Sequence, residues 1–248
     1  MAVFSDGHVG STMETAGDFS AWTGTSGSPT VQTSIKHHGN NAASVTVDAG
    51  GWSAYFWKDV TSGDSLYARM YFRFSRLPAS GEEYDRLMMV YGAGDGFGGV
   101  EVRVNYDDAD GFARLMARNN YFGTIVDGPQ VYADTWYCVE TLNVKSGTEN
   151  WWVDGALQTS PGNGAMSMDR FCCGGVHIGG SSPVTIISDC FGLDTSAIGV
   201  ETSGPTVKKG SCVPAMTALL TKFSALRQPR EPRFQPRTFP KFSPRSLV

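Results

Sequence analysis

Two segments of this sequence place charged and aromatic side chains at every second position, a pattern that suits binding of a polar ligand. One lies in residues 66–75 and the other in residues 100–106. Alternate residues of an extended strand share one face, so each segment would present guanidinium, phenol or carboxylate groups side by side. Such a mixture favours hydrogen bonding and ring stacking to a sugar, and we predict a carbohydrate-binding groove. The predicted binding residues are Arg69, Tyr71, Arg73, Glu101, Arg103 and Trp52.

A second interpretation of the same arginines is structural. Arginines on neighbouring strands pair with acidic residues across a solvated sheet face, and the sequence supplies Asp85, Glu101 and Glu140 for this purpose. Exposed pairs of this kind add little stability and need no ligand. The sequence leaves both interpretations open.

Histidine and cysteine spacing gives no metal-binding motif. His37 and His38 are adjacent, and adjacent strand residues face opposite ways, so the two rings are not expected to share an ion. The cysteines lack CxxC spacing, and their odd number cannot form a closed set of disulfides. We expect buried thiols, with one bridge from Cys172 or Cys173 to Cys190 as the alternative in an oxidising compartment. The five cysteines are Cys138, Cys172, Cys173, Cys190 and Cys212.

These side chains must be positioned by strands, because hydrophobic residues recur with a period of two along the first 200 residues. In residues 66–75, Ala68, Met70, Phe72 and Phe74 share the apolar face. Many glycine-rich turns separate such segments, and no helix is expected before Pro214. The pattern predicts an all-β, antiparallel jelly-roll sandwich. The expected strands are 44–48, 52–60, 66–75, 86–91, 100–106, 112–118, 136–144, 149–153, 176–179 and 184–193.

Composition and charge divide the 248 residues into two parts. Residues 1–204 hold 11 Lys and Arg against 23 Asp and Glu, a net charge of −12, whereas residues 205–248 have a net charge of +8. An acidic body argues against a nucleic-acid partner. No apolar run reaches the roughly 18 residues that span a bilayer, and the first ten residues lack the features of a signal peptide.

The C-terminal part predicts a short helix followed by an extended arm. Residues 214–226 repeat apolar side chains at helical spacing, and prolines recur every three to five residues beyond Gln228. We expect residues 1–204 to form the jelly roll and residues 205–248 to dock on neighbouring protein subunits. The alternative is a disordered basic tail. The predicted assembly residues are Met216, Leu220, Phe223, Phe234, Phe239 and Phe242.

Five short motifs, in this order, resemble the concanavalin A-like lectin and glucanase superfamily, especially laminin-G-like domains and polysaccharide-lyase-like jelly rolls. The resemblance covers about residues 4–200. It implies two curved sheets, a carbohydrate-binding face and a structural calcium ion, for which Asp18 and Asp189 are candidates, while no cofactor is required. The motifs are Asp18-Phe-Ser-Ala-Trp22, Trp136-Tyr-Cys-Val-Glu140, Trp151-Trp-Val-Asp-Gly155, His177-Ile-Gly-Gly180 and Asp194-Thr-Ser-Ala-Ile-Gly199.

Catalytic motifs of this superfamily are absent. Its retaining glycosidases need paired carboxylates in a Glu-x-Asp pattern about 5–5.5 Å apart, and this sequence has none. Its lyases neutralise a uronate with Arg and remove the C5 proton with His or Tyr. His177, Tyr71 and Arg73 could supply those groups, although the family's lyase motifs are missing. A polysaccharide lyase acting on acidic glycans is therefore the alternative to a non-catalytic binding module.

The expected function is that of a display domain that binds carbohydrate or mediates adhesion. We expect the C-terminal arm to attach this domain to a larger assembly, such as a phage virion or another surface particle. The expected location is an extracellular surface or a virion.

Overall fold

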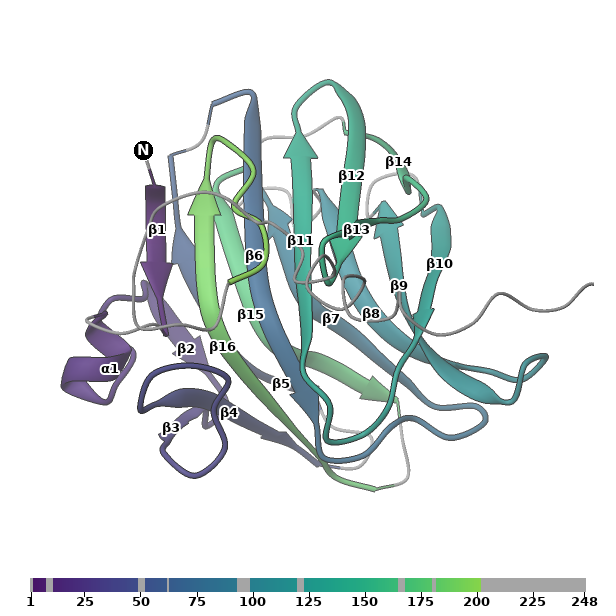
Figure 1. Cartoon of the computed structure of the whole chain (residues 1–248), viewed down its shortest axis with the longest axis horizontal. Helices are drawn as coiled ribbons and strands as arrows, with labels where there is room; N and C mark the ends of the chain where they lie inside the picture. Colours follow the sequence, from purple (N-terminus) through teal and green to yellow (C-terminus); the bar gives the residue numbers. More distant parts are fainter. Residues whose placement is uncertain are drawn as a thin grey trace, which may run out of the picture. The chain divides into compact units, whose positions relative to one another are not determined.

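Two antiparallel β-sheets packed face to face form most of the described part of the chain (Figure 1). The computed structural model describes residues 2–7, 11–48, 52–61, 63–92, 99–119, 123–164, 168–179 and 182–201. The predicted all-β sandwich is thus confirmed.

Sheet A contains nine strands. They are β1 (Ala2–Asp6), β3 (Thr30–Gln32), β4 (Ala42–Val47), β6 (Ser65–Phe74), β11 (Tyr137–Val144), β12 (Gly147–Val153), β13 (Ala156–Leu157), β14 (Gly162–Gly164) and β16 (Val184–Asp194). The strand order is β13-β12-β11-β6-β16-β4-β3, with β1 paired to β16 and β14 paired to β12. The long strands β6, β11 and β16 therefore form the centre of this sheet.

Sheet B contains seven strands. They are β2 (Gly24–Ser26), β5 (Trp52–Asp59), β7 (Glu83–Tyr91), β8 (Val100–Asp107), β9 (Phe112–Asn119), β10 (Ile125–Gln130) and β15 (Arg170–Gly179). Their order is β10-β9-β8-β7-β15-β5-β2. The chain crosses between the sheets several times, so strands that follow one another in sequence often lie in different sheets. This crossing decides which polar residues can meet.

The core lies between the sheets and follows the period-two pattern. Ala68, Met70, Phe72 and Phe74 of β6 are all 0% exposed, as predicted. The valines of β8 at positions 100, 102 and 104 are also 0% exposed. Each fully buried Val, Met or Phe side chain contributes about 1.5–3 kcal/mol relative to an exposed one. The intervening residues of both strands must therefore point out of the sandwich.

A short helix near the N-terminus corrects the expectation of no helix before Pro214. Helix α1 (Thr12–Ala16) ends at Gly17, whose φ of 70° lies in the left-handed region that glycine adopts without strain. The buried Asp6 carboxylate fixes this region, because it accepts Met13 N at 2.9 Å and Trp22 Nε1 at 2.8 Å. The helix has five residues and lacks a periodic sequence signal, so pattern analysis could not find it.

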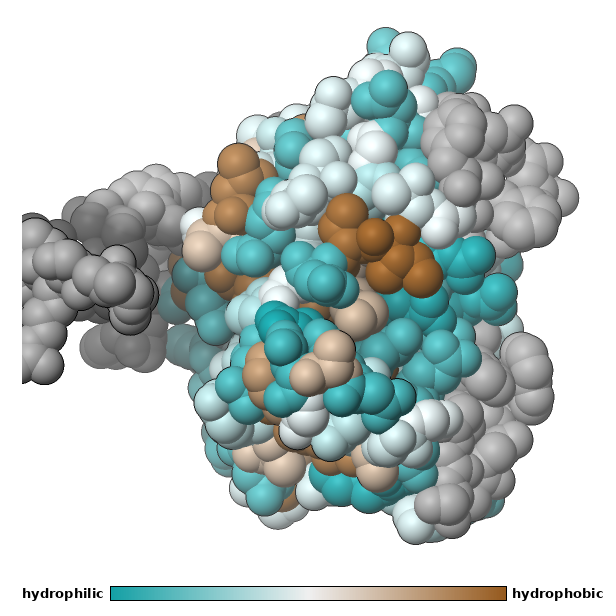
Figure 2. Space-filling model, turned by 90° about the vertical axis from the view of Figure 1, so that its right-hand side faces the viewer, coloured by the Kyte–Doolittle hydropathy of each residue, from teal (hydrophilic) through white to brown (hydrophobic). Residues whose placement is uncertain are grey.

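One edge of the sandwich carries the exposed large hydrophobic side chains Ile125 of β10 and Leu157 of β13. The described surface in Figure 2 is mostly hydrophilic, and its hydrophobic atoms form small separate groups. Scattered apolar residues of this kind are normal on a protein surface. The described part of this view therefore offers no broad apolar docking surface.

The predicted helix 214–226 and the arm beyond it lie outside the described residues, with all six predicted assembly residues. The boundary predicted near residue 204 also lies outside the described residues, which end at Glu201. In the described residues, no helix is long and apolar enough to cross a membrane. The four described cysteines are buried free thiols, as the first interpretation expected.

Candidate functional site

The predicted groove residues do not form one groove. Arg69, Tyr71 and Arg73 lie on the outer face of sheet A, whereas Glu101 and Arg103 lie on the outer face of sheet B. The alternation of faces was read correctly within each strand. The error concerns topology, because β6 and β8 belong to opposite sheets and their outer faces point in opposite directions.

Arg69 is buried beneath the segment that follows β16. Its guanidinium donates to Gly199 O at 2.9 Å and to Cys190 O at 3.2 Å, and it pairs with the Glu201 carboxylate at 3.0 Å. The hydroxyl of Tyr71 accepts Glu201 N at 2.6 Å. These two side chains, predicted to bind sugar, therefore hold residues 199–201, the segment after β16, against the outer face of sheet A.

Two neighbouring polar side chains on sheet A also bind groups of the chain itself. The Glu140 carboxylate accepts the backbone N–H groups of Ile198 and Gly199 at 2.9 and 2.6 Å. Arg73 pairs with Asp134 at 2.7 Å near the rim of the sheet. On sheet A the structural interpretation of the arginines therefore fits what is observed, although their partners are Glu201 and Asp134 instead of Glu140.

Sheet B carries a compact group of charges around Arg103. Its Nε donates to Asp85 Oδ1 at 2.7 Å, and its Nη2 lies 3.1 Å from Glu83 Oε2. Glu101 Oε1 is 3.9 Å from the same guanidinium. These side chains were expected on a solvated face, yet Arg103 and Glu101 are only 5% and 1% exposed. Desolvation strengthens the electrostatic interactions within this group.

Glu101 is the unusual member of the group. Burial raises the pKa of its carboxyl, and the nearby Arg86 and Arg118 act in the opposite direction. Arg86 Nε approaches Glu101 Oε2 to 3.7 Å. Among the described residues, neither Glu101 oxygen has a hydrogen-bond donor, and Arg118 Nε has no hydrogen-bond acceptor. Buried polar atoms without hydrogen-bond partners are rare in folded proteins.

Aromatic side chains lie on the outer face of sheet B, several strands away from Arg103. Tyr55 and Trp57 of β5 have ring centroids 5.7 Å apart, and the Arg170 guanidinium lies 5.3 Å from the Trp57 ring. The indole Nε1 of Trp57 is buried without a hydrogen-bond partner in the described residues. Trp52, the aromatic residue predicted to bind sugar, belongs to the same strand as Trp57 but lies an odd number of positions from it. Its side chain lies outside the described residues.

Cross-strand register joins the aromatic end to the charged end. Trp57 pairs with Cys172, Cys172 with Met89, Met89 with Glu101, and Glu101 with Arg118. Strands are about 4.8 Å apart, so three steps separate Trp57 from Glu101 by about 14 Å. A pocket of about 280 Å³ opens at the end of this face. It is lined by Gly81, Glu82, Glu83, Asn105, Tyr106 and Asp108.

The three residues considered for a lyase are divided in the same way as the groove. Tyr71 and Arg73 lie on sheet A, whereas His177 lies in β15 of sheet B, in register with Asp85. The His177 side chain lies outside the description. The predicted trio is therefore not assembled, and a proton-abstracting group would need different neighbours.

The two calcium candidates have different environments. Asp18 accepts Ser20 N at 2.9 Å in an exposed turn, and hydrogen bonds from the Ser20 side chain and backbone lower its pKa. Asp189 is fully buried, and burial raises its pKa to about 7. Its oxygens accept the N–H groups of His37, His38 and Cys190 at 2.8, 3.0 and 2.8 Å. Asp189 therefore anchors the loop that carries the two histidines.

Comparison with solved structures defines the fold. The chain is similar to the cellulose-induced protein Cip1, with a TM-score of 0.58 and 16% sequence identity over 80% of this chain and 100% of that one. The alginate lyase AlgAT5, from polysaccharide lyase family 7, gives a TM-score of 0.47 and 10% identity over 64% of this chain and 80% of that one.

A structure that concerns cell entry of botulinum neurotoxin type C through interaction with two ganglioside molecules gives a TM-score of 0.46 and 10% sequence identity, over 68% of this chain and 42% of that one. No family model matches the chain, and no curated protein matches it. Identities this low bear on the fold alone. The similarity to Cip1 and the two antiparallel sheets confirm a jelly-roll β-sandwich, the fold that the concanavalin A-like resemblance implied.

Proposed function

We propose that the outer face of sheet B binds carbohydrate. The observation that carries this proposal is the row from Trp57 to Arg118, which places an aromatic ring and an under-bonded charged group on one face. The flat faces of sugar rings are apolar and stack on aromatic side chains, whereas their hydroxyls need donors and acceptors. A span of about 14 Å between Trp57 and Glu101 suits an oligosaccharide better than a single sugar.

Glu101 and Arg103 have distinct roles in this proposal. Arg103 is held rigid by Asp85 and Glu83, so it orients the site without a large loss of side-chain freedom on binding. The Glu101 oxygens are buried and lack donors among the described residues, so in this proposal they accept hydrogen bonds from sugar hydroxyls once the side chains covering them move aside. Guanidinium and carboxylate groups alternate along the face, which favours a neutral or mixed glycan over a polyanion.

Isothermal titration against glycans selected on an array tests the proposal. Trp57→Ala should weaken binding at least about tenfold, since lost ring stacking is worth about 1.4 kcal/mol or more. Trp152→Ala is the matched control, because Trp152 is half-buried on sheet A and packs on Tyr67. Equal loss in both variants, or a parent protein that binds none of the glycans, would overturn the proposal.

A polysaccharide lyase is the second candidate, supported by the placement of His177 opposite Asp85, the partner of Arg103. In β-elimination an arginine neutralises the uronate carboxylate, a base removes the C5 proton, and the 4-oxygen leaves with the electron pair. The unsaturated product absorbs ultraviolet light. Release of that product by the parent, and its loss in His177→Ala, would support this candidate over a binding module.

We also propose that residues 205–248 attach the domain to neighbouring protein subunits. Residues 205–248 have a net charge of +8, and the body has a net charge of −12. This asymmetry favours docking of the arm on an acidic protein surface in a larger assembly. An adhesive or virion-associated location follows from this proposal, and it depends on the deletion experiment described in the Discussion.

A further inference from the structure

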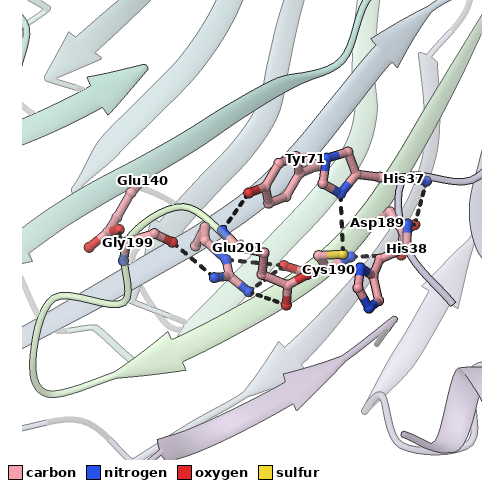
Figure 3. A network of polar contacts seen from close by, with 9 residues as sticks. His37, His38, Tyr71, Glu140, Asp189, Cys190, Gly199 and Glu201 are labelled. Carbon is pink, nitrogen blue, oxygen red and sulfur yellow. Dashed lines mark hydrogen bonds and ion pairs between the residues drawn. The ribbon is translucent and has the colours of Figure 1, made fainter. Parts of the chain in front are cut away.

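Three metal-ligating side chains converge on the opposite side of the sandwich, above sheet A. They are His37 from the loop after β3, Cys190 from β16, and Glu201 from the segment after β16 (Figure 3). One ligand atom of each lies within 4.8 Å of the others, and His37 Nδ1 is 3.8 Å from Cys190 Sγ. The glycan proposal uses none of these residues.

Each of the three residues is held in place by its own contacts. The loop carrying His37 is tied to Asp189, and the imidazole stacks on Tyr71 with ring centroids 3.9 Å apart. Cys190 has a φ of 53°, a strained value for a residue with a side chain, and its N–H is bound by Asp189. Glu201 N donates to the Tyr71 hydroxyl. Such positioning reduces the conformational cost of binding an ion.

We propose that His37, Cys190 and Glu201 bind a zinc ion. Sulfur, imidazole nitrogen and carboxylate oxygen together are a zinc donor set, whereas calcium and magnesium take oxygen ligands. Zinc bonds of about 2.3 Å to sulfur and about 2.0 Å to nitrogen place two tetrahedral ligands about 3.5 Å apart. The observed 3.8 Å between Nδ1 and Sγ needs little adjustment. The backbone of Glu201 is fixed by Tyr71, and rotation of its side chain closes the remaining gap from at most 4.8 Å between ligand atoms.

Neighbouring groups suit this assignment. Arg69 donates to Glu201 Oε1 at 3.0 Å and orients that carboxylate, as outer groups orient metal ligands elsewhere. Glu140 and Asp189 are further carboxylates in the same network (Figure 3). The positive charge of Arg69 alone therefore does not balance the carboxylates of the network.

A cysteine nucleophile is the competing assignment of the Cys190–His37 pair. Burial raises the pKa of the Cys190 thiol, and the nearby Asp189 and Glu201 carboxylates raise it further. A reactive cysteine needs the opposite, an exposed thiol with a lowered pKa. Cys190 is 0% exposed. A bound cation supplies the positive charge that stabilises the thiolate, and nucleophilic chemistry does not.

Metal titration of the full-length protein, with any histidine tag removed, tests the proposal. We expect one zinc ion per chain, and with cobalt as the probe we expect a thiolate-to-cobalt charge-transfer band. His37→Gln and Cys190→Ala should each weaken cobalt binding at least about tenfold and abolish or shift that band. The matched controls are His38→Gln, whose ring lies outside the cluster, and Cys138→Ala, a buried thiol on β11.

Circular dichroism would establish that each variant is folded, and His37→Gln decides the matter if Cys190→Ala is not. The proposal fails if the parent binds no stoichiometric metal or gives no thiolate band. It also fails if Cys138→Ala removes the band as completely as Cys190→Ala does, or if folded His37→Gln binds cobalt as tightly as the parent.

Discussion

Replacing Glu149 by glutamine should make the protein more stable at neutral pH. Glu149 of β12 points into the sandwich beside Trp151 and is 0% exposed. Its Oε2 accepts Asn119 Nδ2 at 2.9 Å, whereas its Oε1 has no hydrogen-bond donor among the described residues. Burial therefore raises the pKa of this carboxyl from 4.5 to about 7. The folded protein holds the proton more tightly than the unfolded chain does.

The size and direction of the effect follow from linkage. Between pH 4.5 and pH 7 the folded state binds a proton that the unfolded state has lost, so the free energy of unfolding falls as pH rises. One pKa step is worth about 1.4 kcal/mol, and the raised pKa corresponds to a loss of about 3 kcal/mol by pH 7 and above. Glutamine has no such titration and keeps the hydrogen bond from Asn119.

Urea unfolding of the parent and Glu149→Gln, followed by circular dichroism at pH values from 4.5 to above 7, measures this difference. The two unfolding free energies should be similar at pH 4.5, and the variant should be about 3 kcal/mol more stable above pH 7. Asp48→Asn, which removes an exposed carboxyl, is the control and should follow the parent. Parallel curves for the parent and Glu149→Gln would refute the reasoning.

Two further predictions concern the core and the C-terminal arm. Phe72→Ala should lower the free energy of unfolding by about 3–5 kcal/mol, because Phe72 is 0% exposed and stacks on Phe74. Arg73→Ala on the other face of β6 is its control, and a loss below about 1 kcal/mol for Phe72→Ala would contradict the assigned faces. Deleting residues 205–248 should leave the midpoint of thermal unfolding almost unchanged, since every described strand lies within residues 2–194. The same deletion should abolish oligomerisation, as measured by native mass spectrometry; a truncated chain that assembles like the parent would show that the arm is not needed.

Strand identity and facing are the parts of this structure that local sequence determined. Ten expected strands correspond to β4–β9, β11, β12, β15 and β16, with ends within a few residues apart from β15, which begins six residues earlier. The inward positions of Phe72 and Val102 follow from period-two burial, which depends on neighbouring residues alone. The six strands that were not predicted are short or at edges, where the alternating pattern has little length in which to develop.

The candidate sites were less predictable, because they depend on register and crossover. Arg73 and Arg103 have the same local pattern, yet β6 and β8 lie in opposite sheets. The row from Trp57 to Arg118 joins residues more than 60 positions apart in sequence through four strand pairings. No local pattern encodes those pairings, since they result from the packing of the whole core.

The convergence above sheet A illustrates the same limit more strongly. His37, Cys190 and Glu201 have no motif spacing, and the first two are brought together by hydrogen bonds from the histidine loop to Asp189 across more than 150 residues. The sequence by itself determined an acidic β-sandwich body, its core faces and a separate basic C-terminal part. Only the tertiary structure decided which polar groups share a surface, because side-chain alternation is local whereas strand pairing is a property of the folded chain.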